Sequence, residues 1–174
     1  MGGKEILDNY LIHIAGYDTA DVLYGHEATE LAFDDEGVSV AVREPDGGQR
    51  TITAGAVVLA RGGFEGNRDM LRKHPGRDAE DLPIIVPGIK YNRGACISMA
   101  TGIGAETDEQ FDPDGRVLDH GGNPIPRLYA AGEITGHFHR KHPASTSVLR
   151  ASAFGRIVGT SVARSLPHPA AATG

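Results

Sequence analysis

The stretch from Leu128 to Arg156 gathers most of the side chains in this sequence that could do chemistry. An apolar segment within it ends at Gly132-Glu133, and a loop rich in imidazoles follows. The loop histidines are His137, His139 and His142. A carboxylate directly after a buried strand must be hydrated or hydrogen-bonded, so Glu133 could accept a hydrogen bond from a ligand hydroxyl or cap its own turn. Glu133 is therefore the first candidate functional residue.

The loop histidines allow three interpretations. A hydrated polar loop is the simplest, and proton transfer by His139 or His142 is the second, since imidazole titrates near neutral pH. The H-x-H-x-x-H spacing could also hold a metal ion through neutral imidazoles, an interpretation that we rank last. We therefore take His139, His142 and Glu133 as the candidate catalytic residues and assign no metal ligand.

A long helix is expected behind this loop. Ser145 or Thr146 can cap it, and the helix should run to about Leu166. Arg150, in its first turns, would face the loop and its carboxylate or else lie on the surface. The C-terminal segment looks frayed, so residues 1–166 are expected to form one domain and 167–174 a disordered tail.

Composition limits the range of functions. A length of 174 residues is usual for one domain and sufficient to bury a core. The 17 Lys and Arg against 23 Asp and Glu give a formal net charge of −6, which argues against nucleic acid or an anionic membrane as the main partner. No apolar run reaches about 18 residues and no signal peptide is evident, so a cytoplasmic protein is expected. The single cysteine, Cys96, excludes an internal disulfide.

The first half of the chain carries clear helix and strand signals. Lys4 to Ala15 has apolar residues at helical spacing, and Asp21 to Tyr24 is a short strand candidate. Alternating segments separated by turn signals predict a three-stranded antiparallel meander: Glu27 to Phe33, Gly37 to Arg43 and Gln49 to Thr53. The run Ala56 to Ala60 is apolar throughout, as is typical of a strand covered on both faces, and it stops at Gly62-Gly63.

The second half carries fewer regular signals. Asn67 to Lys73 and Ile97 to Ile103 are expected to be short helices, and the proline-rich segment from His74 to Tyr91 a loop. Asp112 to Pro126 is rich in turn residues, and Leu128 to Ala131 is expected to be the second buried strand. These elements predict an α/β fold.

Four segments match a known pattern: "VVLARGGFEGN", "YNRGACISMATGIGA", "RVLDHGGNPIPRLYAAGEITG" and "FGRIVG". In this order they resemble the FAD-binding domain of the fumarate reductase and succinate dehydrogenase flavoprotein family, which includes the ketosteroid and tricarballylate dehydrogenases. The resemblance covers nearly the whole chain. It implies a remnant of a Rossmann-like FAD-binding domain with an antiparallel β-meander and a long C-terminal helix.

The resemblance also implies which residues would contact FAD. In the family, the carboxylate matching Glu133 accepts a hydrogen bond from a ribitol hydroxyl. The final helix points its N-terminus at the flavin, where free N–H groups favour negative charge. Glycines let the backbone approach such a cofactor closely. The implied cofactor-binding residues are Gly62, Gly63, Gly132, Glu133, Ser147, Val148 and Arg150.

The sequence departs from the family pattern in two large respects. No G-x-G-x-x-G motif opens the chain, whereas relatives carry this phosphate loop ahead of the segment matching "GGK". The family's substrate cap, with its catalytic His and Arg, would lie between Gln110 and Asp114, where "DEQFDPDG" joins the two directly. In addition, Arg61 stands where relatives usually have Thr. We therefore expect a truncated domain that does not bind FAD tightly by itself.

Three functions remain open at this point. The first is a flavoprotein-type oxidoreductase domain or fragment that needs a partner for FAD. The second is a flavin-free isomerase, cyclase or lyase that reuses the pocket with His and Glu acid-base chemistry, and the third is a non-catalytic binding module. A small hydrophobic carbonyl or alkene is the candidate substrate class.

Assembly follows from the missing strand. Without the phosphate-loop strand, the apolar sheet edge at "AVVLA" would be uncovered and would invite pairing with another chain. Removal of the cap would also leave apolar surface over the old pocket. A homodimer or a heteromer with a Rossmann-bearing chain is expected, with its interface at the sheet edge or around residues 83–95.

Overall fold

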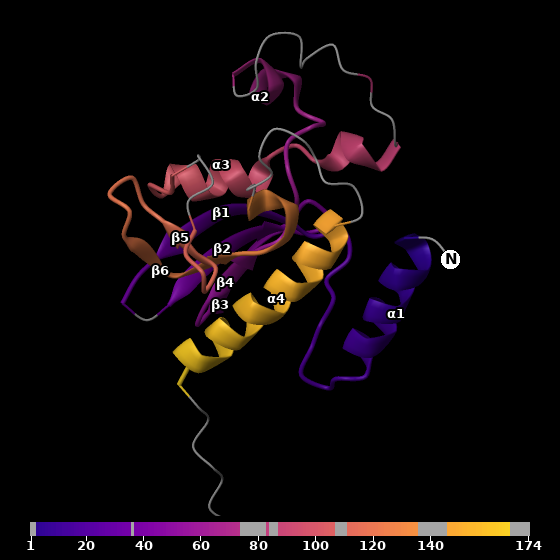
Figure 1. Cartoon of the computed structure of the whole chain (residues 1–174), viewed down its shortest axis with the longest axis horizontal. Helices are drawn as coiled ribbons and strands as arrows, with labels where there is room; N and C mark the ends of the chain where they lie inside the picture. The colour runs from indigo at the N-terminus through magenta and orange to yellow at the C-terminus, as the bar shows by residue number, and fades with distance from the viewer. Residues whose placement is uncertain are drawn as a thin grey trace, which may run out of the picture.

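The computed structural model describes residues 3–35, 37–73, 83, 87–106, 111–135 and 146–167, without the side chains of residues 146 and 147. These residues form a mixed α/β fold with an antiparallel meander, a second three-stranded sheet and a long C-terminal helix. Figure 1 shows the long helix crossing the body of the molecule. The predicted fold class is confirmed.

The N-terminal helix α1, Gly3–Ala15, agrees with the prediction but contributes no buried residue. Figure 1 shows α1 set apart from α4 at one side of the molecule. The strand predicted from Asp21 to Tyr24 is wrong: this segment is irregular, and both Val22 and Tyr24 are exposed. Its apolar residues have no described strand beside them with which to pair.

The predicted meander is confirmed. Its strands, in the order β1-β2-β3, are β1 Glu27–Phe33, β2 Val38–Arg43 and β3 Gln49–Ala54. The first turn is closed by Asp34, whose Oδ1 accepts a hydrogen bond of 2.8 Å from the backbone N–H of Gly37. Leu31 and Val38 are the meander residues that are buried in the main core.

A second sheet has the order β4-β6-β5. Its strands are β4 Val57–Leu59, β5 Arg116–Leu118 and β6 Pro124–Ala130. β6 pairs parallel with β4 and antiparallel with β5. The sequence interpretation started β6 too late, at Leu128, and missed β5 altogether, because it treated the whole segment from Asp112 to Pro126 as turns.

The turn between β5 and β6 is held by the carboxylate of Asp119. Its Oδ1 accepts hydrogen bonds of 2.8 Å from the backbone N–H groups of Gly121 and Asn123. The backbone N–H of Asn123, followed by its side-chain amide and then by the N–H of Gly121, holds the pKa of Asp119 below its usual value. The turn residues therefore close a hairpin here instead of extending a loop.

The helical segments differ modestly from the predicted ones. They are α2 Arg68–Lys73, η2 Pro87–Tyr91, α3 Ala95–Gly102, η3 Gly132–Thr135 and α4 Thr146–Ser165. Asn67 caps α2, since its Oδ1 accepts hydrogen bonds of 3.2 Å from the N–H groups of Asp69 and Met70. η2 corrects the expected loop, and the predicted tail beyond Pro167 lies outside the described residues.

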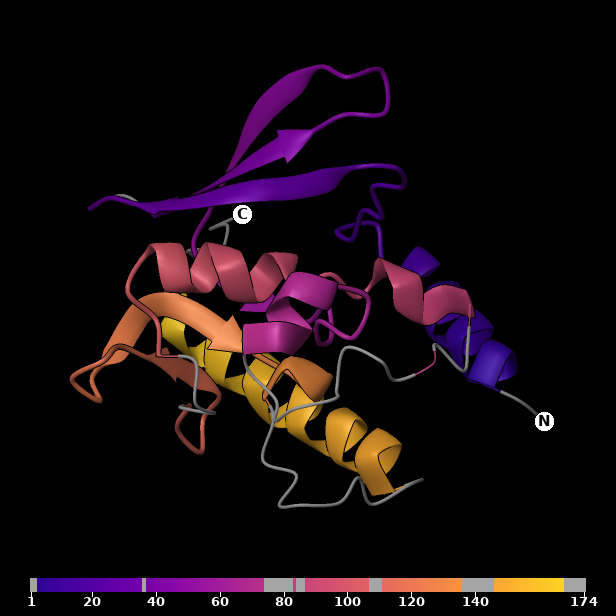
Figure 2. The same cartoon turned by 90° about the horizontal axis from the view of Figure 1, so that it is seen from above.

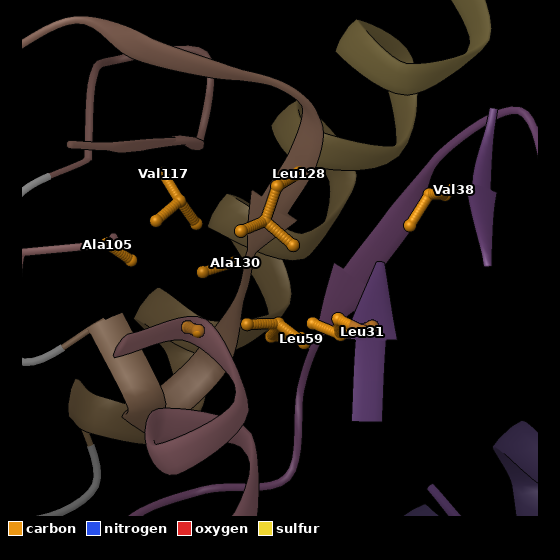
Figure 3. Close-up of a cluster of buried hydrophobic side chains, with 8 residues drawn as sticks. Leu31, Val38, Leu59, Ala105, Val117, Leu128 and Ala130 are labelled. Atoms are coloured by element: carbon orange, nitrogen blue, oxygen red, sulfur yellow. The ribbon is translucent and has the colours of Figure 1, made fainter. Parts of the chain in front are cut away.

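β6 is covered on both faces, and its side chains alternate between two cores. Leu128 and Ala130 pack with residues of the meander and α3, whereas Tyr129 and Ala131 pack against Val158 of α4. Figure 2 shows the meander as a layer of its own above α3 and β6, with α4 beneath them, and Figure 3 shows the first core. The period of two follows from the pleat of the strand.

β4 is less enclosed than its apolar sequence suggests. Leu59 is buried, but Val58 is 41% exposed. The prediction that both faces of this strand are covered is therefore wrong. The reason is that α4 packs against β6, and within the described residues β4 pairs only with β6 and forms an edge of the sheet.

None of the helices in the described ranges is long and apolar enough to cross a membrane.

Candidate functional site

A cavity of about 250 Å³ lies at the carboxyl ends of β4 and β6. Because Leu59 is paired with Ala130, the two parallel strands end side by side. The ladder continues for one more bond, of 2.9 Å, from the N–H of Ala131 to the carbonyl of Leu59. The loops after both strands and the first turns of α4 enclose the cavity. Ligands of open α/β sheets bind at this position, outside the carboxyl ends of the strands.

Five of the seven residues that the sequence implied for cofactor binding line this one cavity. They are Gly62, Gly132, Glu133, Val148 and Arg150. Gly63 is not among the lining residues, and its carbonyl instead accepts a 3.2 Å hydrogen bond from the N–H of Gly94. The side chain of Ser147 lies outside the described residues. The fold therefore brings residues from three segments of the chain together around this cavity.

Two of the lining glycines have backbone conformations that favour glycine. Gly62 has φ 75° and Gly132 has φ 83°, both in the left-handed region. A Cβ built on Gly132 would meet no atom within 4 Å, so this residue leaves open space beside the cavity. A Cβ at Gly62 would first meet the side chain of Asn92, at 3.5 Å. The cavity wall is thus partly bare backbone.

Thr135 joins the end of the β6 loop to α4. Its hydroxyl donates a 2.6 Å hydrogen bond to the carbonyl of Gly132 and accepts one of 3.4 Å from Nη2 of Arg150. Thr135 is 3% exposed, so this connection lies inside the protein. It fixes the guanidinium of Arg150 beside the cavity. The sequence interpretation missed Thr135, although it stands only two residues after Glu133.

Phe154 and Ala151 complete the α4 side of the cavity. The ring of Phe154 packs against the core around Val158. It also meets the ring of Phe111 edge to face, with centroids 5.1 Å apart. Phe154 therefore belongs both to the core and to the cavity wall.

Of the three candidate catalytic residues, only Glu133 can be placed. It lines the cavity as described above. His139 and His142, together with His137, lie outside the described residues, so their proposed roles stay predictions. Among the described residues, no group of three His, Cys, Asp or Glu side chains could hold a metal ion.

Arg61 is not among the residues that line this cavity, although its neighbours Ala60 and Gly62 are. Its positive charge acts on Cys96, whose pKa is nevertheless raised, because burial outweighs the charge and the hydrogen bond from the Arg61 backbone. It also acts on Glu27, whose pKa is lowered first by the hydrogen bond from Arg43. Cys96 is half-buried against the main core, as a small packing residue would be.

The fold and the cavity together are those of an α/β domain with a ligand-sized cavity at the carboxyl ends of its parallel strands. A family model described as an FAD binding domain matches residues 1–111 and 101–149. The chain belongs to this family of FAD-binding flavoproteins and is an oxidoreductase-type domain. A search among curated proteins finds no match.

The described residues fit one end of FAD. Bare backbone at Gly132 leaves room for a bulky group, and Glu133 offers an acceptor to a hydroxyl. Arg150 adds a positive charge on the α4 side of the same cavity. These are the donors and acceptors that a ribitol chain and a flavin ring would use.

Proposed function

We propose that this chain supplies the flavin-holding part of an FAD-dependent oxidoreductase similar to the fumarate reductase and ketosteroid dehydrogenase flavoproteins. One observation carries the proposal: residues from three segments, which the family resemblance implied as flavin contacts, line a single cavity at the ends of two parallel strands. Gly62, Glu133 and Arg150 come from different parts of the chain, and their meeting around one cavity is what a flavin site would require.

Each lining residue has a separate task in this proposal. Glu133 accepts a hydrogen bond from a ribitol hydroxyl, and the backbone at Gly62 and Gly132 lets the cofactor approach closely. Arg150, held by Thr135, would place its positive charge beside a bound flavin, where it would stabilise the negative charge that the ring gains on reduction. FAD, when bound, supplies hydride acceptance or donation. His139 and His142 are proposed to move protons to or from the substrate, for which a small hydrophobic carbonyl or alkene is the candidate class.

The other end of FAD has no evident holder in these 174 residues. The sequence contains no G-x-G-x-x-G motif between a strand and a helix, and this motif is the usual cradle for a pyrophosphate. We propose that a partner supplies it, either a Rossmann-bearing chain or a second copy. Within the described residues β4 pairs only with β6, and its Val58 is exposed; this edge supports the idea, because a sheet edge can accept an added strand. A cytoplasmic location remains part of the proposal.

A comparison of flavins tests whether this chain holds only the ribitol and ring of FAD. The purified chain is titrated with riboflavin, FMN and FAD, and binding is followed by the quenching of flavin fluorescence. If only the ribitol and ring are held, all three bind weakly and within about threefold of one another, since the phosphate and adenosine groups find no partner. Submicromolar, stoichiometric FAD binding, with riboflavin much weaker, would refute the need for a partner.

The variant Glu133→Gln localises the binding. It should weaken all three flavins by about tenfold, because a charge-assisted hydrogen bond to a hydroxyl is replaced by a neutral one. Glu30→Gln, at an exposed position of β1, is the matched control, and this variant should bind each flavin like the wild type. If no flavin binds the wild type at all, the flavin-free acid-base enzyme becomes the better proposal.

A further inference from the structure

A second cavity, of about 100 Å³, lies between α3 and the face of the second sheet that carries Leu59 and Ala130. Most of its lining is apolar and comes from several helices, strands and connecting segments, and it includes Ile97, Ala100, Phe111 and Val117. Engineered apolar cavities of about 150 Å³ accept a benzene ring, so this space is of the right order for one ring. No task in the proposed flavin chemistry uses it.

This apolar cavity is separate from the flavin-holding cavity but adjoins it. Thr135 lines both. The edge-to-face contact between Phe111 and Phe154 forms another part of the division, since Phe111 lines the apolar cavity and Phe154 lines the other. The two spaces therefore differ in chemistry as well as in position: one is walled by bare backbone and charged groups, the other by hydrocarbon.

The polar side chains of the apolar cavity present acceptors. The hydroxyl of Thr101 donates its proton to the carbonyl of Ser98 at 3.0 Å, and that of Thr135 donates to Gly132. Because both hydroxyl protons are already donated, these two oxygens can bind a ligand only as hydrogen-bond acceptors. The third polar group is the carboxylate of Glu106, whose Oε2 lies 2.8 Å from Nδ1 of His120. An ionised carboxylate only accepts hydrogen bonds.

We propose that this apolar cavity is a binding site for a small aromatic alcohol of the phenol class. The ring fills the space lined by Ile97, Ala100 and Phe111, and the O–H group donates to an acceptor at the polar rim, with Glu106 the strongest. A carboxylate-bearing ring is disfavoured, because it brings no donor and its charge repels Glu106. A ring without a donor loses the hydrogen bond but keeps the burial of its carbon atoms.

The probes for a test are phenol, toluene and benzoate. Phenol and toluene have the same shape and differ in the donor, whereas benzoate reverses the polar chemistry. Calorimetric or NMR titration of the purified chain at neutral pH should show phenol binding about fivefold more tightly than toluene, and benzoate at least about tenfold more weakly than phenol. Equal binding of phenol and toluene, or preferred binding of benzoate, would overturn the proposal.

Two matched substitutions locate the site. Ala100→Leu places extra carbon atoms in the apolar cavity and should weaken phenol by at least about tenfold. Ala151→Leu makes the same change in the flavin-holding cavity and should leave phenol binding within about twofold of the wild type. The opposite pattern, or equal effects of both changes, would place phenol elsewhere and contradict the inference.

A third variant keeps the proposal testable should Ala100→Leu fail to fold. Glu106→Met retains side-chain length at the cavity rim but removes the acceptor. Toluene should bind as it does to the wild type, while the advantage of phenol over toluene should fall below about twofold. An unchanged advantage would exclude Glu106 as the acceptor and refute the proposed mode of binding. None of these measurements needs a flavin, so failure here leaves the proposed oxidoreductase function untouched.

Discussion

Gly132 offers a sharp test of the flavin-holding cavity, because a matched glycine exists outside it. Gly132 has φ 83° and Gly104 has φ 89°, and a Cβ built on either would meet no atom within 4 Å. Replacement by alanine therefore imposes the same backbone strain at both positions without a clash. Only Gly132 lines the cavity. Both variants should consequently lose stability to the same extent, whereas only Gly132→Ala should lose flavin affinity.

The expected loss of stability follows from two opposing effects. An alanine in the left-handed region costs about 1–2 kcal/mol. The unfolded chain loses conformational freedom when glycine becomes alanine, and this effect stabilises the folded state by about 0.4–1 kcal/mol. Gly132→Ala and Gly104→Ala should each lower the free energy of unfolding by about 1 kcal/mol. For a chain of this size, the melting temperature should fall by about 2–4 °C.

Flavin binding should respond to Gly132→Ala alone. The added methyl group narrows the space left for the cofactor, and overpacking of this kind costs about 1–3 kcal/mol, or roughly tenfold in affinity. Thermal unfolding and riboflavin titration of both variants are the assays. Equal flavin affinity in the two variants would refute the assignment of the cavity, and wild-type stability in both would refute the backbone argument.

Three further predictions concern stability and assembly. Thr135→Val should lower the free energy of unfolding by about 1 kcal/mol in denaturant titration, since it removes the hydrogen bond from the buried Thr135 hydroxyl to the carbonyl of Gly132, whereas Thr135→Ser should approach the wild type. The pKa of Glu27 is lowered by Arg43, so this pair stabilises the fold above the ordinary value of 4.5 and loses its effect as the pH falls through the lowered pKa. In Arg43→Met, thermal unfolding below pH 4.5 should therefore depend less on pH, and an identical acid profile would contradict the pairing. The chain is expected to associate through the β4 edge, and light scattering should show Val58→Lys shifted toward monomer; a monomeric wild type at micromolar concentration would refute this expectation.

Most of the residues that line the candidate cavity could be named beforehand because the resemblance to the flavoprotein family implied them. The local signals placed them at the ends of regular elements: Gly62 and Gly132 follow apolar strands, and Arg150 stands in the first turns of the expected helix. Thr135 was missed because its importance comes from two contacts, to Gly132 and Arg150, that only the folded chain creates. A lone threonine in a loop carries no such signal.

The errors in the fold have physical causes too. β6 contains Pro124 and Pro126, which normally argue against a strand within a sheet. They are tolerated because β4 pairs only with the last part of β6, from Leu128 onward, so one side of the strand is free at the prolines. Val58 was misjudged for the opposite reason, since an apolar run does not reveal whether a helix will lie over it.

The alternation of side chains along β6 determines where the chain can tolerate a change of length. Leu128 and Ala130 serve one core, and Tyr129 and Ala131 serve the other. A residue inserted between Leu128 and Ala131 would exchange the two sets and turn Tyr129 toward the meander. An insertion at Gly121-Gly122, in the exposed hairpin turn, leaves the strand register intact. A tag or a partner-binding peptide is therefore best placed in that turn, where it would lengthen the chain without moving Glu133.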